Sequence, residues 1–253
     1  MCLMDLEFVT IADRPDLFRY VTDFPDDTVA EFLYQDPVSN ALFVGLIERH
    51  PEFTVMAVDP GVPAPVGMTC TMPFTGSPDG ELPPGGYDAV LLSAAADAVA
   101  GRRGDRVAAL FAVVRPQLRG TGLSPRLMTV ACDNGARLGY SELVVPARPT
   151  RKHEHPRMPM ADYMAWTRED GLPVDPWLRV HVRAGGEIVG LAPSSMTITG
   201  TLDEWRRWTG LPFAESGPVE VPGGFVPVQC DTVAGVASYV EPNVWVRHRL
   251  SPR

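Results

Sequence analysis

A continuous apolar run followed by a glycine-containing turn is the feature that most restricts the fold of this chain. The run RVAALFAVV, residues 106–114, has the length of a strand and lacks polar alternation, which is typical of a central strand buried on both faces. The next stretch, RPQLRGTGLSPRLM, places Gly120 and Gly122 between this strand and a helical pattern. A strand that enters a helix through such a turn predicts an α/β sheet protein.

The helix after the turn has a predicted beginning and end. Ser124 suits its N-cap and Pro125 its first position, while Gly139 predicts its C-terminal end. A short apolar strand, ELVVPA, follows at 142–147. Because a helix joins the two strands, we expect the strand at 106–116 to be central and locally parallel to the strand at 142–147.

The remaining pattern predicts a mixed sheet of about six or seven strands flanked by helices. We read the chain as one domain, 1–253, with insertions at 75–105 and 148–177. Further expected strands are LEFVTIA, EFTVMAV, PVGMTCTMPF, EIVGLAP, GGFVPVQC and NVWVRHRL, and short helices are expected in DLFRYVTDF, DDTVAEFLYQ and PVSNALFVGLIERH. Helix signals occur at Asp88 and Gly101, at Asp175 and Pro176, and at Thr201, Glu204 and Gly210.

Composition narrows the range of partners. The formal charge of -9, from 31 acidic and 22 basic residues, argues against a surface that neutralises nucleic-acid phosphates. No apolar run approaches the roughly 18 residues that span a bilayer, and MCLMDLEFVT lacks a signal peptide's basic start. Cys2, Cys70, Cys132 and Cys230 form no CxxC pair, so neither a metal site nor a disulfide framework is predicted. We expect a soluble cytoplasmic protein that binds neither nucleic acid nor membrane.

The turn itself predicts an anion site. Unpaired N–H groups gather at a helix start, where the helix dipole is positive, and Arg119 adds a charge near them. The Walker pattern is excluded because no Gly-Lys-Ser/Thr follows, and the Rossmann pattern is incomplete because Pro125 stands where its third glycine belongs. A pyrophosphate suits the spacing. The alternative is that Gly120 and Gly122 only make a tight turn.

Strand, turn and helix together resemble the acyl-coenzyme A loop of the GCN5-related N-acetyltransferase family. The family pattern, Gln/Arg-x-x-Gly-x-Gly/Ala, is matched by Arg119, Gly120, Thr121, Gly122, Leu123 and Ser124, and Ser124 departs from its last position. The resemblance covers 106–147 most directly. It implies a mostly antiparallel mixed sheet, an acyl-coenzyme A co-substrate, most simply acetyl-coenzyme A, and a small-molecule amine acceptor. It also implies that Val113 and Val114 present main-chain groups to the pantetheine arm, while 148–253 looks like a distinct branch.

The resemblance also suggests a proton donor for the departing thiolate. The family often places a tyrosine there, in the pattern Tyr-x-x-x-Gly-Phe, and His181 occupies that place ahead of Gly185 and Gly186. A histidine can donate and accept protons near neutral pH. Tyr163 is the rival acid. The alternative for both His181 and Tyr163 is a role in packing alone, without a part in catalysis.

Other groups remain without an assigned role. A basic segment could bind the 3'-phosphate of coenzyme A, an acidic acceptor or only solvent: Arg148, Arg151, Lys152, His153, His155 and Arg157. No spacing selects a general base among Glu142, Asp162, Glu169, Asp170 and Glu241. Trp205 and Trp208 are expected in the core. A homodimer is considered as well. Alternatives to an acetyltransferase are a non-catalytic acyl-coenzyme A sensor and a thioester decarboxylase on the same fold.

Overall fold

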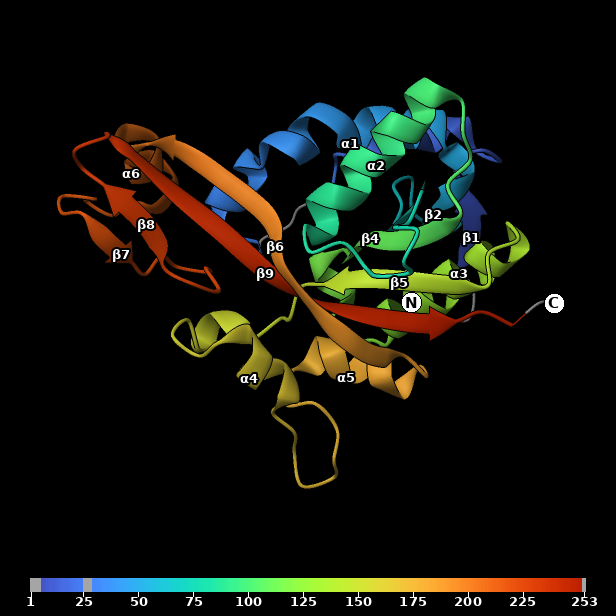
Figure 1. Cartoon of the computed structure of the whole chain (residues 1–253). Coiled ribbons are helices and arrows are strands. Elements are labelled where there is room, and N and C mark those ends of the chain that lie inside the picture. The colour runs from blue at the N-terminus through green and yellow to red at the C-terminus, as the bar shows by residue number, and fades with distance from the viewer. Residues whose placement is uncertain (1–5, 25–28, 252–253) are drawn as a thin grey trace.

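A single sheet runs through the molecule (Figure 1). The structure is a computed structural model that describes residues 6–24 and 29–251. Strands follow one another across the sheet in the order β1 (Glu7–Thr10), β2 (Thr54–Val58), β3 (Gly67–Phe74), β4 (Arg106–Val114), β5 (Glu142–Ala147), β9 (Val236–Arg249), β8 (Val228–Asp231) and β7 (Gly217–Val219), and β6 (Glu187–Thr201) pairs with β9. The sheet has nine strands among these residues, so the expected six or seven was too few.

Strand directions agree with the predicted mixed, mostly antiparallel sheet. Only β4 and β5 pair in parallel, and every other ladder between the named strands is antiparallel. The strand at 106–114 is central, between β3 and β5. Both predictions about this strand are therefore confirmed.

Helices cover both faces of the sheet (Figure 1). One face carries α1 (Pro37–Arg49) and α2 (Gly86–Ala100), and the other carries α3 (Leu123–Arg137) and α5 (Pro176–Arg183). The remaining α-helices are α4 (Met160–Ala165) and α6 (Leu202–Thr209). The two short helices expected ahead of α1 are 3-10 helices, at Pro15–Tyr20 and Glu31–Gln35, and further 3-10 turns lie at Pro51–Phe53, Pro116–Leu118 and Lys152–Glu154.

Two helix starts differ from the sequence prediction. The N-cap of α3 is Gly122, with φ of 93°, so the helix begins at Leu123 instead of after Ser124. Pro125 then lies at the third helical position, where its missing N–H is still not needed, because the first four N–H groups of a helix have no intrahelical partner. The N-cap of α2 is Gly85, and Asp88 lies inside the first turn.

Other helix ends match the sequence. Asp175 caps α5 by accepting hydrogen bonds from the N–H groups of Trp177 and Leu178. Thr201 and Glu204 form the capping box of α6. Left-handed glycines follow the helices at the expected places: Gly101, Gly139, Gly185 and Gly210.

The C-terminal third is more regular than predicted. The expected strands EIVGLAP and NVWVRHRL are parts of the long strands β6 and β9, whose pairing has register shifts between Ile188 and Gly190 and between Ala192 and Met196. The paired strands β6 and β9 form a long ribbon, and α6, β7 and β8 lie at its far end (Figure 1). These elements enclose a separate hydrophobic cluster that includes Phe32, Trp205 and Tyr239.

The structure bears on the expected absence of membrane spans and on the state of the cysteines. No helix in the described part of the chain is long and apolar enough to cross a membrane. Cys70, Cys132 and Cys230 are free thiols. Cys2 and the first residues, on which the signal-peptide expectation partly rests, lie outside the described residues.

Candidate functional site

The parallel ladder between β4 and β5 is short. It contains only two pairs, Val107 with Leu143 and Ala108 with Val144. The ladder of β4 with β3 has a bulge at the same level, because the residue opposite Cys70 is Phe111 and the residue opposite Thr71 is Ala109. Leu110 is thus the extra residue, and such a bulge bends its strand. Beyond Ala108, the edge of β4 that faces β5 has no strand partner among the described residues.

The unpaired part of β4 contains the two valines of the sequence prediction. Val113 packs into the cluster that lies under α1 and α2, and Val114 packs with Leu123 and Leu127 of α3. Their side chains thus anchor the strand on opposite faces. Alternate residues of a strand turn their N–H and C=O groups to opposite sides, so one of these two valines presents its backbone to the unpaired edge.

The predicted anion loop leads from this edge to the start of α3. Arg119, Gly120, Thr121 and Gly122 are all exposed, and a Cβ added at either glycine would meet nothing within 4 Å. The glycines are needed instead for their backbone, with φ of 76° at Gly120 and 93° at Gly122. In the described part of the chain, the N–H groups of both glycines donate no hydrogen bond. The loop thus offers free N–H groups at the positive end of a helix of 15 residues.

His181 is completely buried in α5. Its Nδ1 lies 2.9 Å from Nε2 of His248 in β9, and the Trp177 ring packs edge-on at 4.6 Å between centroids. Burial, with a smaller effect of His248, lowers the pKa of His181 to about 3, so the imidazole is uncharged at neutral pH. Its Nε2 is buried without a hydrogen-bond partner among the described residues.

Tyr163, the rival acid, is 2% exposed and fully engaged. Its hydroxyl donates to Oδ2 of Asp175 at 3.0 Å, and the same carboxylate accepts from the N–H of Arg151 at 2.9 Å. Burial and the negative charge of Asp175 raise the pKa of Tyr163. Asp175 therefore connects α4, α5 and the basic segment.

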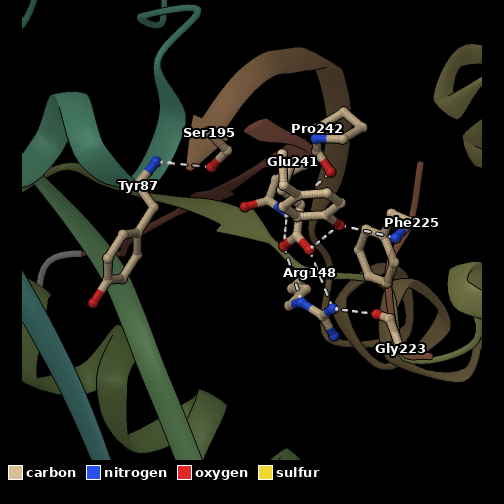
Figure 2. A network of polar contacts seen from close by, with 9 residues as sticks. Tyr87, Arg148, Ser195, Gly223, Phe225, Glu241 and Pro242 are labelled. Atoms are coloured by element: carbon tan, nitrogen blue, oxygen red, sulfur yellow. Dashed lines mark hydrogen bonds and ion pairs between the residues drawn. The ribbon is translucent and has the colours of Figure 1, made fainter. Parts of the chain in front are cut away.

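The first residue of the basic segment belongs to a buried polar network, shown in Figure 2. Arg148 donates to both oxygens of Glu241, at 2.9 and 3.1 Å, and its guanidinium lies 4.0 Å from the centroid of the Phe225 ring. Glu241 also accepts from the hydroxyl of Tyr239 at 2.7 Å and from Asn243 at 3.3 Å. Glu241, one of the candidate bases, is thus held on both oxygens by protein donors.

The other cations of the segment also have partners inside the protein. Lys152 is buried and donates to the carbonyls of His155 and Phe225, each at 2.7 Å, and burial lowers its pKa to about 8. Arg151 pairs with Glu154, and Arg157 pairs with Glu220. The charges of this segment are therefore largely compensated within the protein. Of the other candidate bases, Glu142 lies near Arg106 and Arg247, whereas Asp162, Glu169 and Asp170 are exposed.

A second polar cluster was not identified from the sequence. Asp36, the N-cap of α1, and Asp88, in the first turn of α2, are both buried. Besides burial, the negative charge of Asp36 contributes to the raised pKa of Asp88, so the two carboxyl groups lie close together. Beside them, the hydroxyl of Tyr87 lies 3.1 Å from Oγ of Ser39. Asp36 directly before Pro37 was a readable N-cap signal, but nothing in the sequence shows that Asp88 meets it.

Tyr87 connects this cluster to the sheet. Its N–H donates to Oγ of Ser195 at 2.9 Å, while its ring extends away from the Glu241 network (Figure 2). Ser195 belongs to the irregular stretch of β6 just before Met196, the residue that pairs with Glu241 of β9. The ring of Tyr87 packs in the same cluster as Leu110 and Phe111 of β4. The acidic cluster therefore lies on the α1 and α2 face of the sheet, where the hydrophobic cluster also includes Leu110 at the bulge of β4.

Comparisons with known proteins agree with this architecture. The chain is 34% identical to arginine N-acetyltransferase avaD from Aspergillus versicolor, over 95% of this chain and 93% of that protein. No family model matches the chain. Among solved structures, it resembles the loading GNATL domain of CurA from Lyngbya majuscula, with a TM-score of 0.60, 20% identity and 96% of each chain covered. It also resembles the GphF GNAT-like decarboxylase in complex with isobutyryl-CoA, with a TM-score of 0.51, 18% identity, and 97% of this chain and 99% of that chain covered. These two structural likenesses concern the fold.

Three observations define the class of protein: strands β4 and β5 part, the glycine loop is exposed, and a relative is similar over nearly the whole chain. The chain belongs to the GCN5-related N-acetyltransferase superfamily. It is an N-acetyltransferase that uses acetyl-coenzyme A as co-substrate and a small-molecule amine as acceptor.

Proposed function

We propose that this protein transfers the acetyl group of acetyl-coenzyme A to arginine or a closely related guanidinium-bearing amine. The observation that carries this proposal is the 34% identity, over 95% of the chain, to arginine N-acetyltransferase avaD. The buried carboxyl pair on the α1 and α2 face of the sheet supports it, because guanidinium groups bind carboxylates with two N–H groups at once.

The loop would hold the co-substrate by its pyrophosphate. We assign this role to Arg119, Gly120, Thr121, Gly122, Leu123 and Ser124, and we assign the pantetheine contact to the backbone of Val113 and Val114. Free N–H groups at a helix start stabilise an anion, and an unpaired strand edge supplies the donors and acceptors that an amide-containing arm requires.

The transfer would proceed by direct attack. The acceptor's uncharged amine attacks the thioester carbon, the C–S bond breaks, and the amide nitrogen loses its proton to solvent or a protein base. The thiolate gains a proton or a hydrogen bond as it leaves. We assign this last role to His181, because its Nε2 has no other partner among the described residues, and keep Tyr163 as the rival.

A substrate assay tests the acceptor. Purified protein is mixed with acetyl-coenzyme A and, in separate reactions, arginine, lysine, a neutral aliphatic amine or no amine. We expect thiol release to require an amine and to be fastest with arginine, with one acetyl group on the product by mass spectrometry. The same assay with malonyl-coenzyme A covers the alternatives: carbon dioxide release without an amine would indicate a decarboxylase. Binding without release would indicate a sensor.

A further inference from the structure

Five carboxylates are buried in the described part of the chain, and their hydrogen bonds divide them into two groups. Three have both oxygens occupied by protein donors: Asp97, Asp175 and Glu241. The other two, Asp36 and Asp88, each have one oxygen, Oδ1, that is buried without a partner. A buried unpaired carboxylate oxygen is costly, so these two oxygens need either a proton between them or a donor from a ligand.

The satisfied half of each carboxylate fixes its orientation. Oδ2 of Asp36 accepts from the N–H of Ser39 at 3.0 Å, and Oδ2 of Asp88 accepts from the N–H of Thr197 at 3.2 Å. Neither residue has a basic side chain as an ion-pair partner among the described residues. The two unpaired oxygens therefore belong to carboxyl groups that the backbone holds together without a compensating positive charge.

The pair retains a proton without a ligand. Burial and the neighbouring Asp36 raise the pKa of Asp88 to about 8, and burial raises the pKa of Asp36. Two neighbouring buried carboxylates without a compensating positive charge cannot both be charged at low cost, so the pair holds one proton at neutral pH. The Tyr87 phenol beside the pair and the Cys70 thiol beside that phenol both have a raised pKa and are uncharged at neutral pH.

We propose that Asp36 and Asp88 form the subsite that binds the guanidinium group of the acceptor, with their Oδ1 atoms accepting its N–H groups in place of the shared proton. The inference rests on the proposed function, since it requires a guanidinium-bearing acceptor. The location fits. The N-termini of α1 and α2 bring the pair to the face of the sheet whose hydrophobic cluster also contains Tyr87 and, from β4, Leu110 and Phe111.

The subsite predicts which acceptor groups are recognised. A guanidinium stays charged near neutral pH, whereas the attacking amine must lose its proton before it reacts. A subsite that binds the guanidinium therefore holds the acceptor by a group that takes no part in the reaction and leaves the amine free to attack. Both Oδ1 atoms are shielded from solvent in this structure, so binding must displace the side chains around them. Half-buried Ser39 and Tyr87 are the neighbours with a share of the surface.

The first test compares arginine with citrulline, which has the same length but an uncharged urea in place of the guanidinium. In Asp36→Asn and Asp88→Asn, we expect the KM for arginine to rise by about 10- to 100-fold, the usual effect of losing a hydrogen bond to a charged group. The weak activity with citrulline should change little. Asparagine keeps the N-cap of α1 and removes the repulsion within the pair, so both variants should fold. Asp97→Asn is the matched control, a buried carboxylate with full partners.

The second test does not depend on turnover. Arginine is titrated calorimetrically into the wild-type protein at pH 7 in two buffers with different ionisation enthalpies. Replacement of the shared proton by a guanidinium predicts that the wild-type protein releases more protons per arginine bound than Asp36→Asn does, by up to about one. Wild-type KM values in both folded asparagine variants, or arginine binding without this extra proton release, would overturn the subsite while leaving the arginine acetyltransferase proposal intact. If the wild type acetylates only other amines, the proposed function fails, and absence of arginine binding in the titration then overturns the subsite as well.

Discussion

Single residues differ most clearly in whether their polar atoms are satisfied. Tyr163, which the sequence offered as a proton donor, has its hydroxyl committed to Asp175 at 3.0 Å. His181 makes one contact through Nδ1 and leaves Nε2 buried without a partner among the described residues. A buried ring nitrogen without a partner needs an explanation, and a ligand atom that accepts a hydrogen bond is one for the tautomer in which Nε2 carries the proton. The leaving sulfur of coenzyme A would supply such an acceptor.

Replacement of His181 tests this assignment. Because the pKa of His181 is lowered to about 3, the side chain acts as an uncharged hydrogen-bond donor, and its removal should lower kcat by about 10- to 100-fold. We expect this for His181→Ala with an unchanged Kd for coenzyme A, partial recovery in His181→Tyr, and near wild-type kcat in Tyr163→Phe. No inflection of kcat between pH 5 and pH 8 should come from His181, since its ionisation lies below that range. Wild-type kcat in His181→Ala, with only a lower Tm, would leave His181 a packing residue.

Elements set by local chemistry could be predicted from the sequence. The strand at 106–114, the turn at Gly120 and Gly122 and the parallel partner at 142–147 all follow from apolar patterning and turn residues within one short segment. The start of α3 was misplaced because a glycine at positive φ can cap a helix without a side chain, while Ser124 looked like the better cap. The bulge at Leu110, close to where the β4–β5 ladder ends, has no local signal, because it depends on the register with β3.

The glycine loop yields a prediction with a matched control. Valine at Gly122, where φ is 93°, strains the backbone and brings a side chain to the exposed N–H groups, whereas valine at Gly171, where φ is 76°, strains an exposed loop elsewhere. Both variants should therefore lose about 1 to 2 kcal/mol of unfolding free energy. Only Gly122→Val should weaken coenzyme A binding, by about tenfold or more in calorimetric titration. Equal affinities in the two folded variants would exclude the loop as the pyrophosphate site.

At the scale of the whole molecule, contacts between distant parts of the chain build the acceptor side. Asp36 and Asp88 come from two helix starts, and the ribbon of β6 and β9 supplies Thr197, which orients Asp88. Such pairing depends on three-dimensional register that a single sequence does not display. The sequence predicts only short strands in the ribbon, because polar stretches, including the one at the shift between Ala192 and Met196, interrupt the alternation that marks a strand. For the same reason the acidic cluster was missed while the glycine loop was found.

The cluster at the end of the ribbon connects the C-terminal third to the acceptor side. Trp205 of α6 donates from Nε1 to the carbonyl of Ala237 at 2.8 Å, and its ring lies 5.5 Å from that of Phe32 between centroids. Phe32 belongs to the 3-10 helix Glu31–Gln35, which leads directly into Asp36. Support for the position of Asp36 therefore comes partly from a segment more than 160 residues further along the sequence.

Trp205→Phe should consequently disturb the acceptor more than the co-substrate. Loss of the buried hydrogen bond and of ring volume should lower the unfolding free energy by about 1 to 3 kcal/mol, and Trp208→Phe, at a half-buried position in the same helix, should cost less. Because Phe32 loses its neighbour while the loop at 119–124 is untouched, we expect the KM for the amine to rise several-fold at constant Kd for coenzyme A. Unfolding in denaturant, steady-state kinetics and calorimetry on the same two variants measure these quantities. If Trp205→Phe weakened the binding of the amine and of coenzyme A to the same extent, the substitution would have disturbed the β4 edge together with the ribbon, which would contradict this prediction.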